Sequence, residues 1–292
     1  MAGISTNRTN ITLPQDVSSE IMQKTQEQSA VMTLAKQIAL PGRGLTIPVI
    51  TGDPEASWVD ETDQKPVSNP SLSTKIMQAY KLAVIVPFSD EFARDANALY
   101  DALIARLPLA LAQKFDATVF HGTAPGSNFD TFAAVTAQSI SGTGNSFYSA
   151  LVAADTDIAT HSGILNGFAM SPQAKGEMLA AVDGNDRPLF VNSVAEGAVP
   201  RLIGAPVAYT KGAYKDGTSN TPDVLGFAGD WTQALYGTVE GVMIDMSNQA
   251  TLTISNSQVN LWERNMFAVR AEIEVGFRAD TTVFNKITRA HA

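Results

Sequence analysis

Two stretches in the first third of the chain have the alternating apolar and polar positions of β-strands. The first stretch reads LTIPVIT, from Leu45 to Thr51, and the second runs from Leu72 to Val86. In the second stretch one face collects the apolar side chains Leu72, Ile76, Tyr80, Leu82, Val84 and Val86. Because alternate residues of a strand point to opposite faces, we expect the two stretches to pair as a hairpin.

The connection between these strands runs from Gly52 to Ser71 and is far longer than the roughly two to five residues of an ordinary hairpin loop. It contains Trp58, and Lys65 is its only basic residue among several acidic ones: Asp53, Glu55, Asp60, Glu61 and Asp63. A lone two-stranded hairpin is marginally stable in water. We therefore expect this arm to lie on another subunit, with Trp58 and the acidic residues as the contacting side chains.

A helical pattern follows the second strand. Ser89 is a suitable N-cap, and the two residues after it are acidic, as the helix dipole favours. Apolar residues then recur every three or four positions: Phe92, Ala96, Leu99, Leu103, Leu107, Leu111, Phe115 and Val119. The pattern predicts a helix from Asp90 to His121 that ends at Gly122 and is kinked at Pro108.

A second strand-like pattern lies close to the C-terminus. Six apolar residues alternate with charged ones, and they are Phe267, Val269, Ala271, Ile273, Val275 and Phe277. This alternation predicts a strand with one buried and one solvated face. The strand is the best candidate to cover the apolar stripe of the long helix, so segments far apart in the sequence are expected to form one domain.

Shorter elements fill the rest of the chain. Ser171 and Pro172 are expected to begin a short helix that runs to about Ala181, and Asp183 to Asp186 has the composition of a turn. The remaining expected elements are strands at Pro206 to Tyr209 and Val239 to Met246, and a short helix between Ser18 and Ala39. Together these elements indicate an α+β fold.

The order and spacing of several segments carry a resemblance to a known family. Three of them follow one another in order with short gaps: GLTIPVITGDPEASWVDETD, STKIMQAYKLAVIVPFSDEFARD and LYDALIARLPLALAQKFDATVFHGT. Later segments fit as well, among them VLGFAGDWTQALYGTVEGVMIDMS and LWERNMFAVRAEIEVGFRADTTVFNKIT. In this order the chain resembles the major capsid proteins of tailed bacteriophages with the Hong Kong 97-type fold.

The resemblance implies a division of the chain into an N-terminal arm (1–43), an extended β-hairpin loop (44–88), the spine helix of a peripheral domain (89–128), a mixed α/β axial domain (129–258) and returning peripheral β-strands (259–292). It further implies self-assembly as pentamers and hexamers into an icosahedral head around double-stranded DNA, in a virion that forms in the host cytoplasm. The implied partners are a separate scaffolding protein, a portal and a decoration protein. An encapsulin-like protein compartment and a soluble hydrolase stay as alternatives.

The amino-acid composition excludes several kinds of functional site and partner. The 292 residues include no cysteine, which excludes disulfides, thiolate metal sites and thiol nucleophiles. Twenty basic residues stand against 29 acidic ones, for a net charge of −9, and the basic residues are scattered, so any contact with packaged DNA is expected to be non-specific. The charge-free stretch Thr131 to Ala154 is too polar at its centre for a membrane span, and no membrane partner is expected.

No catalytic, cofactor-binding or metal site is predicted. His121, His161 and His291 lack metal-ligand spacing and are interpreted as structural or solvated. Glu272 and Glu274 share a strand face, but Arg270 and Arg278 beside them favour salt bridges over paired-carboxylate chemistry. Some members of the resembling family join subunits through a lysine and an asparagine. The residues available for such a link carry no further signal, so no cross-link is expected; they are Lys65, Lys75, Asn265 and Asn285.

Overall fold

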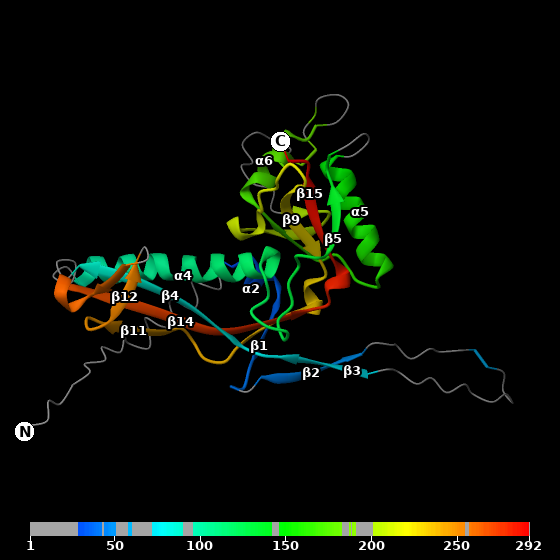
Figure 1. Cartoon of the computed structure of the whole chain (residues 1–292). Helices are drawn as coiled ribbons and strands as arrows, with labels where there is room; N and C mark the ends of the chain where they lie inside the picture. The colour runs from blue at the N-terminus through cyan, green and yellow to red at the C-terminus, as the bar shows by residue number, and fades with distance from the viewer. Residues whose placement is uncertain are drawn as a thin grey trace, which may run out of the picture.

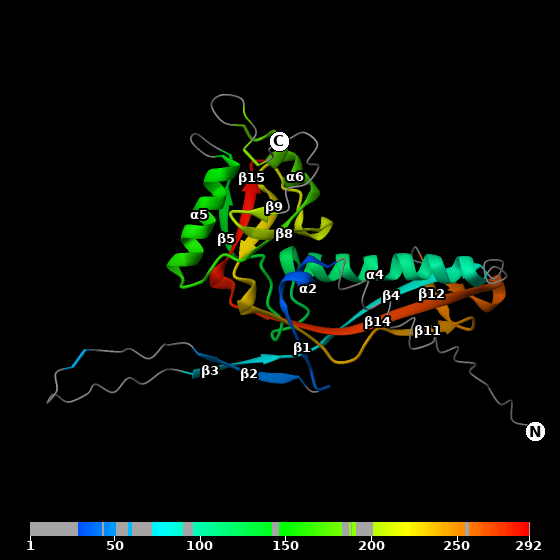
Figure 2. The ribbon, with the colours of Figure 1, turned by 180° about the vertical axis from the view of Figure 1, so that it is seen from behind.

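The computed structural model describes residues 29–42, 44–50, 58–59, 72–89, 96–141, 146–182, 187, 189–190, 201–254 and 257–291. Figure 1 shows three parts. A long half consists of helix α4 lying on a β-sheet, an upright half contains a second sheet with helices α5 and α6, and a two-stranded arm projects from the region where the halves meet. Figure 2 shows the same arrangement from behind.

The sheet of the long half is built around one strand, β14 (Met266–Ala279). On one edge it pairs antiparallel with β4 (Tyr80–Ser89), and on the other with β10 (Ala234–Thr238) and β11 (Met243–Ser247). Strand β1 (Lys36–Ala39) pairs parallel with β10. A small hairpin of β12 (Thr251–Ile254) and β13 (Ser257–Asn260) lies beyond β11 in the chain.

Helix α4 (Ala96–His121) covers the apolar face of this sheet, as the sequence predicts. All six predicted apolar side chains of β14 are buried, and so are Leu107, Leu111, Phe115 and Val119 of the helix. Phe115 meets Phe277 edge to face, with ring centroids 6.4 Å apart. The helix ends at His121, and the amide of Gly122 donates to the carbonyl of Thr118 over 3.1 Å.

The start of the helix stays a prediction. Ser89 is the last residue of β4 and lies opposite Met266 of β14, and the two acidic residues that follow it are outside the described part of the chain. Pro108 lies within α4, which continues on both sides of it. The bounds of the helix do not test the kink at Pro108, which stays a prediction.

The upright half contains a six-stranded sheet in the order β5 (Thr136–Ser139), β15 (Phe284–Arg289), β9 (Asp223–Gly229), β6 (Gly167–Met170), β8 (Ala205–Tyr209) and β7 (Arg201–Leu202). Helices α5 (Phe147–Thr160) and α6 (Pro172–Ala180) pack on one core cluster with this sheet. The predicted cap of α6 is confirmed, because Ser171 Oγ accepts from the amide of Ala174 over 3.1 Å. The predicted strand ending at Tyr209 is confirmed as β8.

An aromatic cluster joins the two halves into one core. Phe132 stacks on Phe284 of β15 at a ring-centroid distance of 4.3 Å and meets Phe277 of β14 edge to face at 5.5 Å. Phe120 of α4 stacks on Phe227 of β9 at 4.7 Å. These side chains are buried, so the halves share apolar surface instead of meeting across solvent.

The arm consists of β2 (Leu45–Ile50) and β3 (Leu72–Met77), which pair antiparallel from Leu45 opposite Met77 to Ile50 opposite Leu72. The prediction of one continuous return strand is wrong. The chain leaves β-pairing at Gln78 and the next residue, and β4 then pairs with β14 instead of continuing the arm. At the end of β3 Met77 is buried, whereas Ile76, which was expected on the apolar face, is exposed.

Further sequence predictions need correction. The helix expected up to Ala39 is limited, in the described part, to α2 (Ala30–Leu34), because the next residues form β1 on the edge of β10. The strand expected at Val239 to Met246 begins only at Met243. The turn expected at Asp183 to Asp186 lies outside the described residues.

Strand pairing also differs from the predicted division of the chain at residue 258. Strands β10 and β11 precede this point but pair with β14 in the long half, and β15 follows it but pairs with β9 in the upright half. The chain therefore crosses between the halves more often than local sequence patterns indicate. The described residues also contain four short 3₁₀ helices: η1 (Lys211–Ala213), η2 (Trp231–Gln233), η3 (Trp262–Arg264) and η4 (Thr281–Val283).

None of the helices in the described residues is both long enough and apolar enough to span a membrane.

Candidate subunit interface and polar clusters

The arm presents its most exposed described side chain far along its length. Trp58 has 103% of its reference accessible area, and Val59 beside it is also exposed. The predicted acidic contact residues lie outside the described part of the chain, and their contact role stays a prediction: Asp53, Glu55, Asp60, Glu61 and Asp63. An indole ring without any covering surface is the kind of group that a protein interface buries.

A buried carboxylate ties the N-terminal segment to the body. Asp116 of α4 accepts hydrogen bonds from Ser29 Oγ over 2.6 Å, from Thr210 Oγ1 over 2.8 Å, and from the amides of Ala30 and Val31. Burial raises the pKa of the Asp116 carboxyl, and the four hydrogen bonds oppose that rise. The side chain joins three segments that are distant in sequence, and the sequence alone gives no sign of it.

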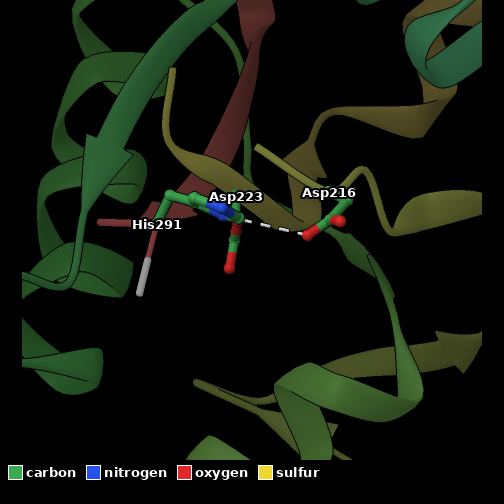
Figure 3. Close-up of side chains that lie close together, drawn as sticks. All are labelled: Asp216, Asp223 and His291. Carbon is green, nitrogen blue, oxygen red and sulfur yellow. Dashed lines mark hydrogen bonds and ion pairs between the residues drawn. The ribbon is translucent and has the colours of Figure 1, made fainter. Parts of the chain in front are cut away.

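A second polar cluster lies where β9 and the C-terminal end of the described chain come together. One ligand-type atom from each of Asp216, Asp223 and His291 lies within 4.8 Å of the others, and Figure 3 shows the three side chains converging. Asp223 is already engaged. It pairs with His291 Nδ1 at 2.7 Å, and it accepts from Arg289 Nη2 over 2.7 Å and from the amide of Gly217 over 2.9 Å.

Hydrogen bonds from Arg289 and His291 hold the pKa of the Asp223 carboxyl well below its usual range. Arg289 also pairs with Glu177 of α6. A metal ion at Asp223 would lie beside this guanidinium and be repelled by it. We interpret the cluster as an ion-pair network that fastens the C-terminal strand to α6 and β9.

The other two histidines have structural contacts in the described residues. His121 Nε2 lies 2.9 Å from the carbonyl oxygen of Ala213, and burial lowers the pKa of His121 to about 4. His161 Nδ1 lies 2.8 Å from the carbonyl oxygen of Asp157, one turn earlier in α5. Both arrangements agree with the structural interpretation of these side chains.

The charged face of β14 forms ion pairs, as expected, and some of the partners come from other segments. Arg270 pairs with Asp245 at 2.7 Å and with Glu272 at 3.4 Å. Glu274 pairs with Lys81 of β4 at 3.3 Å. Arg278 turns to a separate carboxylate, Asp130, at 2.8 Å. The Arg270–Glu272 pair along the strand is confirmed, and Arg270 and Glu274 also pair across to β11 and β4, whereas Arg278 pairs with the loop after α4.

The residues considered for a covalent link differ in their surroundings. Asn285 is buried, with its amide donating to Asp157 over 2.9 Å and accepting from Gln138 over 3.1 Å. Lys75 Nζ donates to the carbonyl of Ala279 over 3.1 Å. Asn265 is exposed in a left-handed conformation with φ 51°, and Lys65 lies outside the described residues. Asn285 and Lys75 are thus engaged within their own chain.

Comparison with known proteins identifies the family. A family model described as the phage capsid family matches residues 9–280. A protein of Mycobacterium phage L5, described as a probable major capsid protein, is 31% identical over 281 residues, which cover 90% of this chain and 85% of that protein.

Solved structures support the same fold. A chain from Gordonia phage Cozz superimposes with a TM-score of 0.72 at 23% identity, covering 91% of this chain and 87% of that one. A chain described as the capsid of an empty GTA particle, computed with C5 symmetry, gives a TM-score of 0.66 at 14% identity, with 90% of both chains covered. The chain therefore belongs to the phage capsid family, as a structural capsid protein with the Hong Kong 97-type fold.

Proposed function

We propose that this chain is the major capsid protein of a tailed-phage head, which assembles as pentamers and hexamers into an icosahedral shell around double-stranded DNA. The observation that carries the proposal is the arm, which leaves the body as a two-stranded ribbon and exposes Trp58 completely. Family membership supplies the second support.

The proposed mechanism is mechanical. The body is one continuous core in which α4, both sheets and the aromatic cluster pack together, and such a core keeps its shape. The arm extends from this body and can reach a second copy. In a closed shell each subunit meets its neighbours in several slightly different settings, so a fixed body with a projecting arm suits repeated contacts between copies.

We also propose a domain assignment from strand pairing. The peripheral domain comprises α4 with the sheet of β1, β4, β10, β11 and β14, and the axial domain comprises the six-stranded sheet with α5 and α6. The arm comprises β2, β3 and their connection. This assignment replaces the linear boundaries at 128 and 258 with an interleaved one.

The partners proposed with this function are other copies of the chain, a separate scaffolding protein, a portal, a decoration protein and non-specifically contacted DNA, with assembly in the host cytoplasm.

We propose no enzymatic activity. A hollow of about 260 Å³ is lined by Thr131, Ala134, Val135, Thr136, His161, Thr281 and Thr282, a set without a carboxylate. His161 directs Nδ1 to a backbone oxygen of its own helix. No observation favours the encapsulin-like compartment or the hydrolase.

Electron microscopy and light scattering of the purified protein, alone and with a co-expressed scaffold, test the proposal. The expected result is closed particles or capsomers with five-fold and six-fold symmetry. A well-folded species that stays strictly monomeric at all salt and protein concentrations would overturn it.

A further inference from the structure

The base of the arm is held by one arginine. Arg278 of β14 is nearly buried, with 11% of its side chain exposed. Its Nε donates to the carbonyl of Ile76 in β3 over 2.8 Å, and its Nη1 donates to Asp130 over 2.8 Å. Its Nη2 donates to Asn128 Oδ1 over 3.0 Å and contacts the carbonyl of Ser127 at 3.4 Å. The guanidinium therefore joins the body strand, the arm strand and the loop after α4.

A lysine of the arm makes a second tie at the same place. Lys75 Nζ donates to the carbonyl of Ala279 over 3.1 Å and lies 3.9 Å from Asp130 Oδ2. The same Asp130 oxygen accepts from the amide of Ala279 over 3.2 Å. Asp130 thus lies between a cation from the body and a cation from the arm, and all these groups converge on the last residues of β14.

Packing beneath these ties leaves little room for the arm to swing. Met77 is fully buried at the point where β3 ends. Gly276 of β14 lies so close that a Cβ there would approach Gln78 O to 2.6 Å and Met77 Cγ to 3.1 Å. Gly44, at the start of the arm, has φ +88° and a Cβ there would approach Met77 O to 2.6 Å. Both glycines permit close backbone approach at the arm base.

The contacts of Arg278 and Lys75 lie next to the break between β3 and β4, through which the chain leads from the arm into the body. The break is at Gln78 and Ala79, between β3 and β4, and Gln78 Oε1 accepts from Asn128 Nδ2 over 3.4 Å. A strand break is where a two-stranded arm would otherwise pivot. Here the residue before the break is buried, and the one before that is bonded to Arg278.

We propose that Arg278 is a positioning residue whose clamp, with Asp130 and Lys75, fixes the direction in which the arm leaves the body before a neighbouring copy binds. This inference rests on the proposed shell function and adds a mechanism to it. An arm already held in its bound direction loses less conformational freedom on assembly, so preorganisation favours contact with the neighbour. The clamp also sets where Trp58 is presented.

The same strand offers a matched control. Arg270 lies eight positions earlier on β14, on the same face, and forms an ion pair of 2.7 Å with Asp245. Its ion-pair partners, Asp245 and Glu272, belong to β11 and β14, so it has the chemistry of Arg278 without the contact to the arm. A general effect of losing an arginine from β14 therefore appears in Arg270→Gln as well as in Arg278→Gln.

The experiment measures arm direction in unassembled subunits. Because the chain has no cysteine, two can be introduced for spin labels at exposed positions, Thr74→Cys in β3 and Asn248→Cys after β11. Pulsed electron paramagnetic resonance then gives the distance distribution between them. We expect a narrow distribution in the parent and in Arg270→Gln, and a broad one in Arg278→Gln. The yield of closed shells should fall about tenfold in Arg278→Gln, as expected for lost charge-assisted hydrogen bonds.

Arg278→Lys keeps the charge beside Asp130 but loses the planar fork, so it should give an intermediate width. Lys75→Gln removes the tie on the arm side without touching the body, and it should broaden the distribution even if Arg278→Gln fails to fold. A distribution as narrow as that of the parent in Lys75→Gln and in any folded Arg278→Gln would overturn the proposal. Failure of the parent to form shells would instead overturn the proposed function, because the distance measurement does not depend on assembly.

Discussion

At the base of the arm Met77 is fully buried and Arg278 bonds to the neighbouring strand, whereas Trp58 farther along the arm is fully exposed. Both regions belong to the arm, the first at the base of its two strands and the second in the connection between them. The base has all its partners within the chain, so its geometry is fixed by folding. The exposed indole finds no covering surface among the described residues, and its burial requires a second molecule. The difference separates residues that stabilise the subunit from residues that stabilise the assembly.

The distinction between the folded body and the exposed arm tip depends first on the shared core of the body. Phe132→Ala removes a ring that packs on Phe284 at 4.3 Å and on Phe277 at 5.5 Å. We expect unfolding to become easier by about 3–5 kcal/mol, because the substitution leaves a large cavity. Urea denaturation measures this free energy, with the exposed Tyr148→Ala as the control. A loss below about 1 kcal/mol would show that the two halves do not share a core.

The base of the arm gives the next largest effect. Met77→Ala should reduce the free energy of unfolding by about 2–3 kcal/mol, since the side chain is fully buried against β14 and β10. Its neighbour Ile76 is half exposed, so Ile76→Ala should change stability by no more than about 0.5 kcal/mol. Equal losses for the two substitutions, measured by urea denaturation, would mean that the arm base is not packed as described.

Acid should weaken the body through His121. Burial lowers the pKa of His121 from 6.5 to about 4, with Lys215 and Lys286 adding to the effect, so the unfolded chain binds the proton more readily. Stability from this group is complete above pH 6.5 and is lost as the pH falls towards 4. Allowing for partial exposure, the loss is about 2 kcal/mol.

His121→Gln keeps a donor for the carbonyl of Ala213 but does not titrate, so its stability should decline less between pH 6.5 and pH 4 than that of the parent. Asp116 works in the opposite direction, because its raised pKa adds stability as the pH falls. It contributes equally to both proteins and cancels in the difference. Parallel pH profiles would show that His121 is not neutral in the folded body.

The smallest change in subunit stability is expected at the tip. Trp58→Ala should alter the free energy of unfolding by no more than about 0.5 kcal/mol, because the indole touches nothing in the described chain. Shell closure should nevertheless be impaired, since truncating an aromatic hot spot costs an interface about 2 kcal/mol or more at every copy. Trp58→Phe should restore part of the closure. Circular dichroism and electron microscopy separate the two readouts, and normal shells from Trp58→Ala would mean that the arm tip is not a contact.

The strongly periodic elements could be predicted from the sequence. The alternation in β14 and the stripe of α4 identified the two faces that pack together, because each pattern continues over many residues. The break at Gln78 between β3 and β4 could not be predicted, because an alternation of apolar and polar residues does not reveal which strand is the pairing partner on either side. The Asp223 cluster escaped as well, because His291 lies 68 positions away in sequence. For the candidate interface, Trp58 was proposed from its place in a long acidic connection, and its contact role stays a prediction. Arg278 was interpreted only as a neighbour of Glu272 and Glu274.

The most direct test of the account is an electron cryo-microscopy reconstruction of the assembled particle at side-chain resolution. The account predicts that the arm keeps the direction set at Arg278 and that the Trp58 ring is buried against a neighbouring copy, next to basic side chains that face the acidic residues of the arm. A reconstruction in which Trp58 stays in solvent, or packs on its own subunit, would contradict the claim that the arm is an assembly element.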